Sequence, residues 1–204
     1  MDRLKVRLAS GNANKARELG RALPEWRIEL LGANAFPPET GATYLDNARA
    51  KARFGRTLVA DDEWVLGEDS GIEVDALGGR PGIESARWAD DGVTRLLEEL
   101  RGVGGEARSA RYVCELVGIS PIGEELRGRG ELHGRIAGEP CGSEGFGYDP
   151  IFVPDGETRT VAELGNEWKA KHSHRARAAR ALRAALTPAP GSPRARPGGA
   201  SATS

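Results

Sequence analysis

The segment from Ser143 to Phe152 combines residue types that suit recognition of a flat aromatic ligand. Between flexible glycines it carries two rings, Phe146 and Tyr148, and the carboxylate of Asp149, followed by a proline. A ring can stack on a nucleobase while a fixed polar group hydrogen-bonds to the edge of the base. A tight turn that leads into a buried strand, with both rings in the core, explains the same segment.

A second candidate site lies where a predicted strand gives way to a predicted helix. Unpaired N–H groups at a helix N-terminus attract phosphate, and a lysine in the first turn adds positive charge. The segment lacks the second glycine and the Lys-Ser/Thr pair of a Walker A loop. Ordinary capping of the helix by an asparagine is the alternative. The residues are Ser10, Gly11, Asn12, Ala13, Asn14 and Lys15.

Three acids form the third candidate site, with Lys51 between them in sequence. Magnesium takes one or two protein carboxylates and completes its shell with water and substrate phosphates. Glu39, Glu68 and Asp69 lie in predicted loops beside strands, where their oxygens can meet. The chain has 30 acidic residues, and most acids in a protein of this size are solvated surface groups.

Three cationic or donor groups, Lys169, His174 and Arg175, precede or open the last predicted helix. They could hold a polar ligand or form a solvated basic face. Arginine dominates the 29 cations, since only five are lysines. A lysine kept against that preference indicates a need for a compact point charge. The lysines are Lys5, Lys15, Lys51, Lys169 and Lys171.

Apolar periodicity predicts the elements that must position these residues. Thr160 with Glu163 predicts a capping box that opens a further short helix. Helices alternate with strands in the first half and strands follow one another in the second, which predicts an α/β or α+β domain. The expected strands cover residues 3–9, 26–30, 64–66, 72–74, 110–119 and 124–136, and the expected helices cover 16–23, 43–54, 93–100 and 173–186.

Composition narrows the classes of protein. A formal net charge of −1 gives no overall field that would attract nucleic acid or an anionic membrane. We find neither an apolar run of about 20 residues nor a signal-peptide pattern. Two cysteines, Cys114 and Cys141, are too few for a disulfide framework and favour free thiols in a cytoplasmic protein.

Taken together and in order, these segments resemble the inosine triphosphate pyrophosphatase family, which acts on non-canonical purine nucleoside triphosphates. The resemblance extends from about Leu4 to Leu186. The matching motifs are Ser10-Gly11-Asn12 with Lys15; Glu39-Thr40-Gly41; Asp46-Asn47-Ala48 with Lys51-Ala52; Asp69-Ser70-Gly71; Asp75 to Gly79 with Pro81-Gly82 and Ser85-Ala86-Arg87; Ala110 to Cys114; Gly145 to Phe152; and Lys169 with Ser173-His174-Arg175.

The resemblance implies the fold and the assembly. We expect an elongated mixed β-sheet flanked by helices, with two lobes, a nucleotide cleft between them, and a homodimer. We expect one domain over residues 1–186 and a disordered tail rich in proline, glycine, serine and arginine over 187–204.

The resemblance also implies a role for each matching residue. Glu39 and Asp69 would bind Mg²⁺, Asp69 would accept a proton, and Lys51 would steady the attacked phosphate or water. Residues 10–15 would cradle the phosphates and Ser70 would contact the nucleotide. The base would be enclosed by Phe146, Gly147, Tyr148, Asp149, Lys169, His174 and Arg175.

The implied reaction hydrolyses ITP, dITP or XTP to the monophosphate and pyrophosphate, with magnesium as the cofactor. Cationic donors such as His174 and Arg175 would accept a C6 keto oxygen and reject the amino group of adenine. A Maf-type nucleotide pyrophosphatase and a nucleotide-binding module without turnover are the alternatives. The chain departs from the family pattern at Glu68, Asp46 and Cys141, and in a short segment after Ala89.

Overall fold

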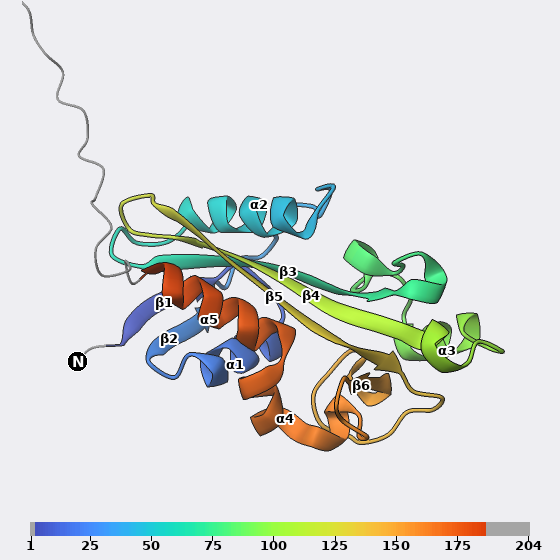
Figure 1. Cartoon of the computed structure of the whole chain (residues 1–204). Coiled ribbons are helices and arrows are strands. Elements are labelled where there is room, and N and C mark those ends of the chain that lie inside the picture. Colours follow the sequence, from blue (N-terminus) through green and yellow to red (C-terminus); the bar gives the residue numbers. More distant parts are fainter. Residues whose placement is uncertain (1–2, 187–204) are drawn as a thin grey trace, which may run out of the picture.

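A computed structural model describes residues 3–186 and shows a mixed six-stranded sheet in the order β2-β1-β3-β4-β5-β6 (Figure 1). β1 pairs in parallel with β2 and β3, and the other neighbours are antiparallel. The predicted tail lies outside the described residues. The strands are β1 (Leu4–Leu8), β2 (Trp26–Leu30), β3 (Trp64–Val74), β4 (Ser109–Ile119), β5 (Glu125–Ile136) and β6 (Phe152–Pro154).

Within residues 3–186, five α-helices flank the sheet. They are α1 (Ala13–Ala22), α2 (Tyr44–Arg56), α3 (Gly92–Glu99), α4 (Val161–His172) and α5 (His174–Leu186). Figure 1 shows α2 on one face of the long central strands and α1 and α5 on the other. The sheet flanked by helices confirms the predicted α/β class. Among the described residues, no helix combines the length and apolar character needed to cross a membrane.

Local sequence signals set where several helices begin. The predicted capping box of Thr160 and Glu163 is confirmed at the start of α4. Thr43 and Asp46 form a second capping box at the N-terminus of α2. Asp46, which departs from the family pattern, therefore helps to cap this helix. Asn12 caps α1 by accepting hydrogen bonds from two N–H groups of its first turn.

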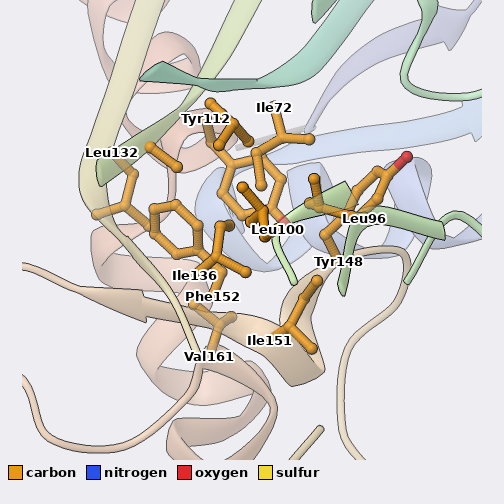
Figure 2. Packing of buried hydrophobic residues seen from close by; sticks show 12 residues of the cluster. Ile72, Leu96, Leu100, Tyr112, Leu132, Ile136, Tyr148, Ile151, Phe152 and Val161 are labelled. Carbon is orange, nitrogen blue, oxygen red and sulfur yellow. The ribbon is translucent and has the colours of Figure 1, made fainter. Parts of the chain in front are cut away.

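Two hydrophobic cores pack against the same face of the sheet, one towards each end of the long strands. The first joins the β1–β2 end of the sheet to α1 and α5 through Leu8, Leu19, Leu66 and Leu182. The second core is shown in Figure 2. It contains Ile72, Leu96, Leu100, Tyr112, Leu132, Ile136, Tyr148, Ile151, Phe152 and Val161.

β3 is one continuous strand, so the prediction of two short strands around a turn at 67–71 was wrong. Every residue from Val65 to Val74 pairs with β4. The glycines reflect close approach to neighbours. A Cβ at Gly67 would come within 1.9 Å of the Ala48 carbonyl oxygen in α2, and a Cβ at Gly71 within 2.1 Å of the Gly82 carbonyl oxygen.

β1 is much shorter than β3, so the second half of β3 has no β1 partner on that edge. β1 pairs with only residues 64–66 of β3. In the described part of the chain, no strand pairs with this edge of β3 from Gly67 to Ile72. Because side chains alternate along a strand, this free edge lets polar groups from both faces of the sheet reach one region.

Candidate active site

Lys51 joins the acids on the α2 face of the sheet. Its Nζ lies 3.1 Å from Asp69 Oδ1, donates to the Glu68 carbonyl oxygen at 3.0 Å, and forms an ion pair with Glu39. The Lys51 side chain is only 8% exposed and that of Asp69 only 4%. A loop, a helix and a strand that are distant in sequence therefore meet at one ammonium group.

Burial and charge act against each other in this cluster. Burial raises the pKa of Asp69 above its usual value, although Lys51 and Asn47 oppose that shift. Burial also disfavours the charge on Glu39, but Lys51, Lys15 and Arg87 outweigh it and lower the pKa. The cationic neighbours therefore outweigh burial at Glu39 but not at Asp69.

The donor set fits a magnesium ion. Two carboxylates, Glu39 and Asp69, contact the same Lys51 ammonium, so their oxygens converge on one small region. Within residues 3–186, no cluster of three or more histidine, cysteine or acidic residues has the arrangement of a metal site. Magnesium needs only one or two protein carboxylates when phosphates and water supply the rest.

Glu68 is predicted from the sequence to group with Glu39 and Asp69, but the structure separates its side chain from theirs. Its side chain leaves the opposite face of β3, where it is fully buried between Lys15 at 2.6 Å and Arg175 at 3.0 Å. Burial opposes ionisation, yet these cations hold the pKa of Glu68 well below its usual range. Glu68 therefore anchors the basic residues Lys15 and Arg175 on the face of β3 opposite to the Asp69 side chain.

Glu18 is a buried acid that sequence reasoning missed. It accepts from Ser173 Oγ at 2.6 Å and Arg175 at 2.8 Å, and lies 3.2 Å from Lys169 Nζ. Burial disfavours its charge, but Arg175 and Lys169 lower the pKa of Glu18 to about 2. A single acid within a predicted helix resembles a surface residue. The one feature of the sequence that could have indicated its burial is its position in α1 beside the apolar Leu19.

The aromatic turn rests on these basic residues. Lys169 Nζ lies 4.4 Å from the centre of the Phe146 ring, and the Arg175 guanidinium lies 5.4 Å from it. Asp149 accepts from the Phe146 N–H at 2.7 Å and pairs with Lys169 at 2.6 Å. Tyr148 belongs to the core, as the alternative interpretation held, whereas Phe146 is only partly buried.

His174 is neutral, which corrects the prediction of a cationic donor. Its ring stacks on Tyr112 at 4.5 Å between centroids with 6° between planes. Burial, assisted by the Arg175 charge, lowers the pKa of His174 to about 3. Its Nδ1 is buried without a hydrogen-bond partner among the described residues, so at most a neutral N–H is available to a ligand.

A cavity of about 490 Å³ joins the aromatic turn to the α1 N-terminus. Ile72, Tyr112, Ala86 and Val93 add an apolar wall. The predicted site residues that line it are Asn12, Asn14, Lys15, Ser70, Phe146, Gly147, Tyr148, Asp149, Lys169, His174 and Arg175.

The remaining predicted residues lie beside this cavity. Ser10 and Gly11 form the turn before α1, where Ser10 Oγ accepts from the Asn12 N–H at 3.1 Å, and Ala13 is the first residue of α1. Glu39, Lys51 and Asp69 do not line the cavity. They form the lysine–carboxylate cluster on the α2 face, and Asp69 directly precedes the cavity-lining Ser70 in the chain.

The chain matches the Ham1 family model over residues 6–185. The dITP/XTP pyrophosphatase of Deinococcus deserti is 46% identical over 187 residues, covering 88% of each chain. That of Bdellovibrio bacteriovorus is 43% identical over 187 residues, covering 86% of this chain and 94% of the relative.

Solved structures give the same result. The Ham1 protein of Staphylococcus aureus has a TM-score of 0.75 at 33% identity and covers 89% of this chain and 97% of its own. The nucleoside-triphosphatase, or dITP/XTP pyrophosphatase, of Mycobacterium abscessus has a TM-score of 0.66 at 41% identity over 91% and 98% of the two chains. The predicted family and fold are confirmed, and this chain belongs to the Ham1 family.

Proposed function

We propose that this chain hydrolyses non-canonical purine nucleoside triphosphates, such as ITP, dITP and XTP, to the monophosphate and pyrophosphate. The relatives named above carry the name dITP/XTP pyrophosphatase. One observation carries the proposal in this chain. A lysine–carboxylate cluster and a ring-lined cavity lie on the two faces of β3, and the adjacent residues Asp69 and Ser70 belong one to each.

At the phosphate end, Lys15 and the N–H groups that open α1 would receive the triphosphate. Glu39 and Asp69 would hold Mg²⁺, which would neutralise charge on the phosphates when bound. Lys51 fixes the Asp69 carboxylate at 3.1 Å. Asp69 would take the proton from the attacking water.

At the base end, Phe146 would stack on the purine while Arg175 and the neutral His174 present donors to its edge. A C6 keto oxygen accepts from such donors, whereas the adenine amino group would face them without a partner. Leaving one buried polar group unpaired costs about 1–3 kcal/mol, which corresponds to roughly ten- to hundredfold discrimination against ATP.

We also propose the setting in which the enzyme acts. The purine nucleotide would be its substrate, and it would act in the cytoplasm, as a homodimer, without binding nucleic acid. A net charge of −1 and two free cysteines support this setting. The dimer rests on the family resemblance alone.

Pyrophosphate release from a panel of ITP, dITP, XTP, GTP and ATP, with and without Mg²⁺, tests the proposal. We expect release from the first three with Mg²⁺, and kcat/KM values for ATP lower by about tenfold or more. Binding of ITP without any release would instead identify a nucleotide-binding module. Equal rates on ATP and ITP would contradict the proposed specificity.

A further inference from the structure

Asn47 connects two parts of the proposed phosphate end, the Asp69 carboxylate and the loop that carries Glu39. It lies in the first turns of α2 and is 2% exposed. Its Nδ2 donates to Asp69 Oδ2 at 3.0 Å, and its Oδ1 accepts from the Gly41 N–H at 2.8 Å. One buried amide thus joins the central strand to the loop that carries Glu39.

The first link fixes the plane of the Asp69 carboxylate. Lys51 contacts Oδ1 at 3.1 Å while Asn47 contacts Oδ2. A carboxylate held at both oxygens cannot rotate freely about its last torsion, whereas one held at a single oxygen can. Asn47 therefore decides in which direction the remaining lone pairs of Asp69 point.

The second link places the loop that carries Glu39. The loop between β2 and α2 contains no helix or strand. Side chains hold its end: Lys51 and Arg87 contact Glu39, and Asn47 accepts from the Gly41 N–H. The approach is tight, because a Cβ at Gly41 would come within 2.7 Å of Asn47 Oδ1. Only glycine lets the backbone come this close, and Glu39 lies two residues earlier in the same loop.

An amide is required for both links at once. Its nitrogen is a donor and its oxygen an acceptor, whereas a carboxylate offers acceptors only and an apolar side chain offers neither. The Gly41 N–H needs a hydrogen-bond acceptor, whereas the Asp69 carboxylate needs a donor. Asparagine at position 47 satisfies both from a single buried side chain.

We propose that Asn47 is a positioning residue that sets the Glu39 loop against the Asp69 carboxylate, so that both acids meet the metal and the phosphates already oriented. This inference rests on the proposed function of the same site. Asn47 itself does not line the substrate cavity. Its loss should therefore reduce kcat and metal affinity, with little effect on recognition of the base.

The variant Asn47→Ala tests this inference against Asp46→Ala. That control removes the carboxylate of the neighbouring capping box of α2, which hydrogen-bonds to Thr43 and not to Asp69 or Gly41. Mn²⁺ binding, measured by electron paramagnetic resonance of the free ion, gives a readout that needs no catalysis. Asn47→Ala should raise the Mn²⁺ dissociation constant about 10–100-fold and lower kcat similarly. At saturating Mg²⁺, its KM for ITP should stay within about threefold of the unchanged protein.

Asp46→Ala should lower the melting temperature by about 2–4 °C, with Mn²⁺ affinity unchanged. If both variants bind Mn²⁺ as the unchanged protein does, Asn47 is only structural and the inference is overturned. If the unchanged protein binds Mn²⁺ but releases no pyrophosphate from ITP, the proposed function fails, and the binding comparison still decides the role of Asn47.

A second measurement uses the full chain without substitution, in case Asn47→Ala does not fold. The Asn47 side-chain NH₂ and the Gly41 N–H should both change resonance in ¹H–¹⁵N spectra as Mg²⁺ is added. Shifts at both groups support the inference. Spectra in which either group stays in place while Mg²⁺ binds elsewhere in the chain would overturn it.

Discussion

Asp69 and Ser70 are adjacent in β3, yet their side chains leave opposite faces of the sheet. Asp69 pairs with Lys51 of α2, whereas Ser70 Oγ accepts from Arg175 of α5 at 2.9 Å. The alternation of a strand separates them, and the absence of a β1 partner beyond residue 66 leaves the edge between them open. One dipeptide can therefore serve both ends of a nucleotide that crosses this edge.

Asp69→Asn should abolish turnover while nucleotide binding survives. The amide keeps the shape of the side chain but cannot accept the proton of the attacking water. A general base contributes about 10²–10⁴-fold, so kcat for ITP should fall at least about a hundredfold. Steady-state kinetics and calorimetric binding of ITP check this, and a near-normal kcat would remove Asp69 from the reaction.

Phe146→Ala should weaken binding of the base. Stacking of a base on an aromatic ring is worth about 1–3 kcal/mol, so we expect KM for ITP to rise between about fivefold and 150-fold. Phe146→Tyr keeps a ring over Lys169 and serves as the matched control, with a KM near the original value. Equal KM values for the alanine and tyrosine variants would show that the ring does not stack on the base.

His174 should make stability depend on pH between about 3 and 6.5. Its folded-state pKa of about 3 lies below the unfolded value of about 6.5. Above pH 6.5 the imidazole is neutral in both states. Below it only the unfolded state takes up the proton, so the folded state loses about 1.4 kcal/mol per pH unit until pH 3.

His174→Asn lacks this proton and should lose less stability than the unchanged protein as the pH falls from 7 to 5. The difference between their free energies of unfolding should change by roughly 2 kcal/mol over that range. Urea denaturation at the two pH values measures it. A difference that stays constant with pH would mean that His174 takes up its proton equally in both states.

Glu18→Gln should destabilise the fold strongly. The carboxylate neutralises Arg175 and Lys169 in a buried cluster, and removing one member of a buried ion pair costs about 3–5 kcal/mol. Glu25→Gln is the matched control, since the Glu25–Arg183 pair is solvent-exposed and such pairs contribute at most about 1 kcal/mol. If the two variants unfold at the same urea concentration, the buried cluster is not stabilising.

Chemistry-bearing residues near glycines or helix starts could be predicted from the sequence. Lys15 stands out because only five of the 29 cations are lysines, and Phe146 and Asp149 stand out beside the glycines of their turn. The apolar periodicity also placed α2 and α5 within a few residues, and Thr160 with Glu163 marked the start of α4.

What could not be predicted depends on contacts between distant segments. Glu18 and Asn47 look like surface residues of helices, and only the packing of α1 and α2 on the sheet buries them. Gly67 and Gly71 resemble turn residues, although each marks close approach of another backbone to a straight strand. The neutral state of His174 follows from burial against Tyr112, which the sequence does not record.

The most direct test is a crystal structure of the chain with a non-hydrolysable ITP analogue and Mg²⁺. We expect the hypoxanthine against Phe146, with the triphosphate crossing the free edge of β3 past Ser70 and Lys15 to end beside Lys51, Glu39 and Asp69. An analogue whose phosphates instead run from the cavity towards α3, without contact to Lys51 or Asp69, would contradict a single groove around β3.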